Sequence, residues 1–184
     1  MPKARMNRAL RLAGIMAALG VATPALGQDQ RPPFGGPEEV DFAEELWQAL
    51  EQRGIVGEEA IQTHPYAGTS MHGPVIQYIS GTVSVGGRTG TFILKRNYRG
   101  EDLSVEETFK NPLRNFDSMG VMFRREEGYA PESRDWFWVK YMPDGMVANT
   151  PDGAKMAGKV GACIGCHQPA EGADFVFSHD RFAR

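Results

Sequence analysis

The chain has 184 residues, of which 20 are basic and 23 acidic, and its formal net charge at pH 7 is −3. An acidic chain is unsuited to nucleic acid, which binds clustered positive charge. The length corresponds to one domain with a core of its own, and no internal repeat is evident.

The first 27 residues have the pattern of a secretory signal peptide. The chain opens with four basic residues and no acidic one: Lys3, Arg5, Arg8 and Arg11. The apolar run over residues 12–21 is shorter than the roughly 20 residues that a membrane helix needs. Small residues suit cleavage after Gly27, so we expect a periplasmic mature chain of about 157 residues with a net charge of about −7. No later run is long and apolar enough to span a membrane.

Residues 28–39 are rich in Pro, Gly and Gln, and they predict a flexible segment before one folded domain over residues 40–184. Apolar side chains at helical spacing predict a first helix over residues 41–53, which Gly54 ends. Asp41 with Glu44 three residues later is a capping-box pattern, which places the start of this helix at Asp41.

The middle of the chain changes to short runs of β-branched and aromatic residues, separated by Gly, Pro and Asp. These runs are GPVIQYISGTVSV (73–85), TGTFILKRNY (89–98), SMGVMFRRE (118–126) and DWFWVKYM (135–142). Most spacers are too short for crossover helices, so antiparallel pairing is expected. Residues 104–112 predict an intervening helix, and residues 154–167 a last helix that carries the cysteines. The expected fold class is α+β, an antiparallel β-sheet with flanking helices.

The only two cysteines stand together as Cys163-x-x-Cys166-His167. A structural zinc site needs four ligands, so the chain would have to recruit distant histidines. A redox pair is expected at a helix start after a strand, and an exported protein can also form a plain disulfide. Cys-x-x-Cys-His is the attachment pattern of c-type haem. We favour one haem c bound covalently through Cys163 and Cys166, with His167 as the iron ligand.

The position of this pattern argues against the commonest small cytochromes. Those are mostly helical, begin with the haem pattern and supply an axial methionine later, whereas no methionine follows His167. Four upstream methionines remain candidates for such a ligand, although core or turn packing is the simpler explanation of each: Met119, Met122, Met142 and Met146. The helical-bundle cytochromes c′ carry the pattern near the C-terminus, but strands here occupy the place of their long helices.

The segment GACIGCHQPAEGADFVFSHD (161–180) closely resembles the C-terminus of the cytochrome P460 family, which includes the cytochromes c′-beta. GTFILK (90–95) and GYAPESRDWFWVKY (128–141) resemble its central strands. Over residues 40–182, the resemblance implies an antiparallel sheet, a homodimer and a five-coordinate haem with an open distal face. P460 proteins oxidise hydroxylamine and carry a lysine–haem cross-link. The c′-beta members lack the link and bind nitric oxide and similar diatomics.

The resemblance also implies a lysine at the haem. Lys95 matches the cross-linking position, and Lys140 is a weaker rival. A lysine among aromatic and β-branched neighbours is costly to bury unpaired, and a bond to the porphyrin would remove its charge. The alternative is that Lys95 points to solvent, on the face opposite Phe92 and Leu94.

The sequence departs from the family at the distal side. The expected carboxylate is missing from SMGVMFRR, where Gly120 and Val121 stand, and an expected arginine is missing from HGPVIQYI. Loss of a positioned base weakens the case for hydroxylamine oxidation, because that reaction must release protons. Asp117 and His72 are the candidates to replace the acid.

These observations favour a protein that oxidises hydroxylamine to nitric oxide or nitrous oxide and passes electrons to a periplasmic cytochrome. Two alternatives stay open. A c′-beta-like protein would bind nitric oxide without turnover, and a plain electron-transfer cytochrome c would hold a six-coordinate, low-spin haem.

Overall fold

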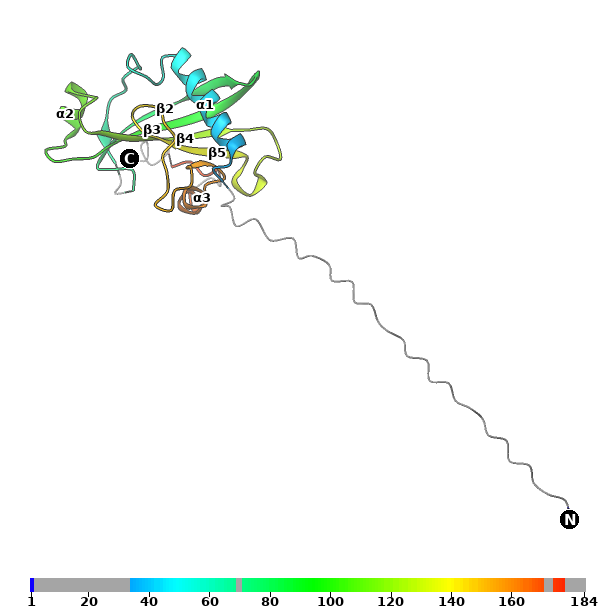
Figure 1. Ribbon diagram of the computed structural model, residues 1–184. Coiled ribbons are helices and arrows are strands. Elements are labelled where there is room, and N and C mark those ends of the chain that lie inside the picture. The colour runs from blue at the N-terminus through cyan, green and yellow to red at the C-terminus, as the bar shows by residue number, and fades with distance from the viewer. Residues whose placement is uncertain (2–33, 69–70, 171–173, 178–184) are drawn as a thin grey trace. The chain divides into compact units, whose positions relative to one another are not determined.

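The computed structural model of the protein describes residue 1 and residues 34–68, 71–170 and 174–177 (Figure 1). Apart from residue 1, the predicted signal peptide lies outside the described residues, as does the predicted flexible segment up to residue 33. None of the described helices is long and apolar enough to cross a membrane.

The described part of the chain is built on one antiparallel sheet with strand order β1-β2-β3-β4-β5-β6. The strands are β1 (Tyr66–Ala67), β2 (Val75–Val85), β3 (Arg88–Tyr98), β4 (Phe116–Arg124), β5 (Trp136–Tyr141) and β6 (Ala157–Gly158). The helices are α1 (Pro37–Gln52), α2 (Val105–Lys110) and α3 (Gly161–His167), with a short 3-10 turn at Pro131–Ser133. The predicted α+β class is confirmed.

The four predicted strands correspond to β2, β3, β4 and β5, and the predicted central helix to α2. β2 and β3 form a hairpin closed by Gly86 and Gly87, whose φ values of 57° and 79° lie in the region that glycine adopts readily. In α2, the hydroxyl of Ser104 accepts the amide N–H of Glu107 at 3.1 Å and so caps the helix.

The first helix starts earlier than predicted. Its N-cap is Gly36 without a side-chain bond, and Pro37 occupies the first turn, where its missing N–H costs nothing. Asp41 therefore lies inside α1, and the capping-box prediction is wrong. Residues 37–39, assigned to the flexible segment, form the first turn of the helix.

The predicted helix over residues 154–167 is also wrong in its first half. Ala157 and Gly158 form β6 and pair with Val139 and Trp138 of β5. The φ of Gly158 is 102°, which no right-handed helix contains. Pairing along the edge of β5 therefore overrides the helical propensity of this segment, and only Gly161–His167 is helical.

The two faces of the sheet are covered differently (Figure 1). Leu94, Val121 and Val139 are in register across β3, β4 and β5, and they belong to the core that α1 covers through Leu46 and Leu50. On the opposite face, a smaller cluster packs beside α3: Ile93, Met122, Trp136, Trp138, Val160, Phe175 and Val176. Because side chains alternate along each strand, one face of the sheet forms the structural core and the other face is available for a site.

Candidate functional site

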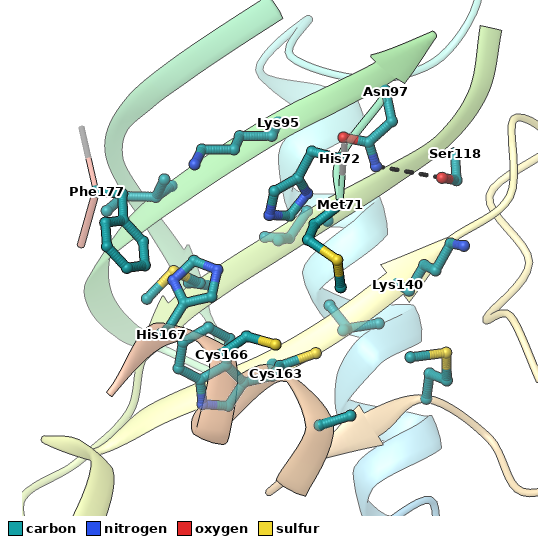
Figure 2. Close-up of a pocket in the computed structure, with 18 of the residues that line it drawn as sticks. Met71, His72, Lys95, Asn97, Ser118, Lys140, Cys163, Cys166, His167 and Phe177 are labelled. Atoms are coloured by element: carbon teal, nitrogen blue, oxygen red, sulfur yellow. Dashed lines mark hydrogen bonds between the residues drawn. The ribbon is translucent and has the colours of Figure 1, made fainter. Parts of the chain in front are cut away.

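Residues that point away from α1 line a cavity of about 270 Å³ between the sheet and α3 (Figure 2). The register places Lys95 of β3 opposite Gly120 of β4, and Gly120 opposite Lys140 of β5, and all three line the cavity. Its other walls are mainly apolar: Tyr78, Ile93, Met122, Trp138, Met156, Val176 and Phe177. Apolar walls with a few polar groups are typical of small-molecule and cofactor sites.

Helix α3 brings both thiols and the imidazole of the cysteine motif to this cavity. Cys163, Cys166 and His167 all line it, and the two cysteines are free rather than joined in a disulfide. Their spacing of three residues places both sulfurs on one face of the helix. Burial, with a smaller contribution from Cys166, raises the pKa of Cys163 to about 11, so this thiol is protonated at neutral pH.

The ring of His167 is fixed by the backbone of the C-terminal tail. Its Nδ1 donates to the carbonyl oxygen of Phe175 at 2.8 Å, so Nε2 is the unprotonated nitrogen of the neutral ring. Burial lowers the pKa of His167, although the bond to Phe175 opposes this. A neutral imidazole whose other nitrogen is held by a carbonyl is the form in which histidine binds metals.

The described part of the tail, residues 174–177, is itself held against the sheet. The indole Nε1 of Trp136 donates to the carbonyl of Asp174 at 2.8 Å, and the Asp174 carboxylate accepts the amide N–H of Val176 at 3.1 Å. Phe175 is 7% exposed and has a φ of 67°, which is rare for residues other than glycine. The DFVF segment (174–177) therefore has a definite role, which is to present a carbonyl to His167.

Lys95 faces the cavity rather than solvent. Phe92 and Leu94 lie on the α1 face, and the Lys95 side chain extends from β3 over the cavity on the side of His167 (Figure 2). Its charge lowers the pKa of both His72 and His167. Lys140 also lines the cavity, but its charge acts on Cys163 instead, whose pKa it lowers against the larger effect of burial.

His72 lies over the glycine that replaces the expected carboxylate. A Cβ atom added to Gly120 would lie 4.0 Å from Cε1 of His72. The ring centroids of His72 and His167 are 5.9 Å apart, and their planes are at 83°. Burial above all, followed by the charge of Lys95, lowers the pKa of His72 to about 4. The imidazole is therefore neutral at physiological pH.

Asp117 is not among the residues that line the cavity, and it reaches the cavity only through other side chains. Its carboxylate accepts the hydroxyl of Ser118 at 2.7 Å, and the Ser118 oxygen accepts Nδ2 of Asn97 at 3.2 Å. Nε of Arg99 is 3.8 Å from the same carboxylate. Asn97, Ser118 and Arg99 all line the cavity. Asp117 thus does not contact the cavity itself but holds Ser118, which does line it.

Asn97, Ser118 and Arg99 are cavity residues that no sequence motif singles out. Asn97 and Ser118 share strand parity with Lys95 and Gly120, so alternation is the signal that identifies them. Arg99 brings an arginine to the cavity from the end of β3, not from the strand where one was expected. No Asp or Glu lines the cavity among the described residues.

The candidate methionine ligands are dispersed. Met122 lines the cavity, Met119 is buried on the α1 face, and Met142 and Met146 are 40% and 61% exposed. Within the described ranges, no three Cys, His, Asp or Glu side chains are arranged to hold a metal ion, so a structural zinc site has no support there.

These features define a protein with a pocket suited to a largely apolar cofactor. The donor set fits haem, because two free thiols and a neutral imidazole share one wall of an apolar cavity. Nε1 of Trp138, whose ring centroid is 4.9 Å from that of His167, is buried without a partner among the described residues. Such an unpaired donor is expected beside a site that a further group completes.

The sequence model of the family named cytochrome P460 matches residues 78–178. The chain therefore belongs to the cytochrome P460 family, and it is a haem-binding cytochrome of that family. No curated protein and no solved structure matches the chain.

Proposed function

We propose that this chain is a periplasmic c-type cytochrome that oxidises hydroxylamine to nitric oxide or nitrous oxide. The observation that carries the proposal is a single cavity lined by Cys163, Cys166, His167 and Lys95. The two thiols would add across the porphyrin vinyl groups, each sulfur bonding to carbon while its proton moves to the neighbouring carbon. His167 would bind the iron through Nε2. Haem held there supplies the redox centre and the position at which small nitrogen compounds bind.

The remaining cavity residues would handle the protons. Oxidation of hydroxylamine to nitric oxide releases three electrons and three protons; two molecules going to nitrous oxide and water release four of each. An electron-accepting periplasmic cytochrome would take the electrons. His72, neutral because its pKa is lowered to about 4, is the base that replaces the missing carboxylate. Solvent outside the cavity would receive the protons.

Lys95 would provide the cross-link. Joining its Nζ to a porphyrin carbon replaces one N–H and one C–H bond, so two electrons and two protons must leave to an oxidant such as hydrogen peroxide. The linked peptide is then two hydrogens lighter than the sum of its parts.

The test uses the full chain expressed with periplasmic haem maturation. We expect mass spectrometry to find haem on the Cys163–Cys166 peptide joined to the Lys95 peptide, a strongly red-shifted ferrous Soret band, and hydroxylamine-dependent reduction of an added cytochrome c. Lys95→Ala should abolish the shifted band and the turnover, whereas Lys140→Ala should keep the shifted band. Wild-type protein that carries haem but does not reduce the acceptor would contradict the proposal.

The second candidate is a c′-beta-like protein that binds nitric oxide without turnover. The lack of a carboxylate among the described cavity residues favours it, because a base is then harder to supply. An ordinary high-spin haem without a lysine link, which binds nitric oxide but does not oxidise hydroxylamine, would establish this candidate. A homodimer is proposed for either function, and light scattering of the holo-protein tests it.

A further inference from the structure

The cavity holds a second imidazole, His72, whose distance from His167 has a chemical meaning. Metal–imidazole bonds are about 2 Å long and the ring centre lies about 1 Å beyond the nitrogen, so two imidazoles bound on opposite sides of one metal have centres about 6 Å apart. The observed separation of the two centroids is 5.9 Å. The angle of 83° between the ring planes is compatible with two imidazoles on one metal. Each ring plane must contain its own nitrogen–metal bond, but the two rings can be rotated about that bond independently. Figure 2 shows the two rings next to one another in the cavity.

Asn97 provides the support that a ligating histidine needs. Its side chain is in reach of His72, and this contact raises the pKa of His72 against the larger lowering by burial. Asn97 is 6% exposed, and its Oδ1 is buried without a hydrogen-bond partner of ordinary geometry among the described residues. A ligating histidine usually donates its second ring nitrogen to such an oxygen. Nδ2 of the same amide is held by Ser118, whose hydroxyl is held by Asp117.

Gly120 leaves the space in which His72 lies. Apart from His72 Cε1 at 4.0 Å, a Cβ atom at this position would meet no heavy atom within 4 Å. A branched side chain there would extend into the position of the imidazole. The absence of a side chain at Gly120 in β4 therefore makes room for the imidazole of His72, which precedes β2.

We infer that His72 is the second axial ligand of the resting protein, bound opposite His167 and displaced when a small ligand binds. The inference rests on the proposed attachment of haem at His167 and goes beyond it, because an open distal face was expected. Displacement leaves the His72 ring beside the newly bound molecule, where it can accept a proton. The Asp117–Ser118–Asn97 chain acts as positioning machinery, since it orients the imidazole without touching the ligand.

The test is the spin state of the ferric holo-protein, measured by electron paramagnetic resonance and absorption. We expect the wild type to be mainly low-spin and His72→Ala mainly high-spin, with added imidazole restoring the low-spin spectrum. His72→Ala should bind azide about tenfold or more tightly, because no internal ligand has to be displaced. His64→Ala is the matched control: His64 stacks on Phe109 and does not line the cavity, so its loss should change neither readout.

A second variant guards against misfolding of the first. Gly120→Val keeps every candidate ligand but crowds His72, and it should raise the high-spin fraction as His72→Ala does. A wild type that is high-spin, or a low-spin spectrum that survives His72→Ala, overturns the inference and would point to a free-standing base or to another ligand. Neither spectrum depends on hydroxylamine turnover, so failure of the inference is distinguishable from failure of the proposed function.

Discussion

At the scale of single residues, two tyrosines beside α1 differ in whether the hydroxyl has a hydrogen-bond partner. Tyr141 donates to the carbonyl of Ala43 at 2.6 Å, whereas the Tyr129 hydroxyl is buried with no partner in the described part of the chain. Tyr141→Phe should lower the free energy of unfolding by about 1–2 kcal/mol, and Tyr129→Phe should leave it unchanged or raise it. Urea unfolding of both holo-variants measures the difference. Equal losses would contradict this account.

Single residues also show where sequence reasoning succeeds and where it stops. Strand parity is enough to put Lys95 and Gly120 on one face and Leu94 on the other, because side chains alternate along every strand. Nothing local tells which face carries the site. The approach of His72 to Asn97 and His167 joins three distant parts of the chain, so only the folded sheet reveals it. The contact of His167 with the carbonyl of Phe175 could not be predicted either, because a backbone group leaves no side-chain pattern in the sequence.

At the scale of elements, α3 depends on the tail that follows it. Trp136→Phe keeps a buried ring but removes the N–H that binds the Asp174 carbonyl. One lost hydrogen bond is worth about 1 kcal/mol, so exchange of the Val176 amide should become about fivefold faster. Hydrogen-exchange mass spectrometry of the holo-protein measures this. Trp47→Phe is the control: Trp47 packs on Tyr141 on the opposite face and should leave that exchange rate unchanged.

The boundaries of helices and strands were predictable from the sequence only where the local sequence signal was strong. The β2–β3 hairpin was predictable because alternation and a Gly-Gly turn agree. The start of α1 was not, because an acidic pair inside a helix has the same spacing as a capping box. The segment at 154–160 has helix-forming residues, yet its partner is the edge of β5, and such long-range pairing overrides propensity. Short elements that are fixed by tertiary contacts are therefore the ones that sequence misplaces.

At the scale of the whole molecule, the sheet has the main hydrophobic core on one face and the candidate site on the other. The α1 face holds the larger core, and the other face holds the proposed haem site and the smaller cluster. Because neighbouring residues in a strand serve opposite faces, a substitution on one face can leave the other intact. The two kinds of damage should therefore be separable by experiment.

Leu46 of α1 and Met122 of β4 make the comparison, because both are buried, at 0% and 6% exposure, but lie on opposite faces. Either substitution to alanine should lower the free energy of unfolding by about 2–5 kcal/mol, through lost contacts and the cavity left behind. Leu46→Ala should keep the absorption spectrum and ligand affinity of the native holo-protein. Met122→Ala, which enlarges the site itself, should change both. Thermal unfolding followed by circular dichroism measures the loss of stability, and absorption spectra recorded before heating report on the site. An absorption change in Leu46→Ala as large as in Met122→Ala would show that the two faces are coupled.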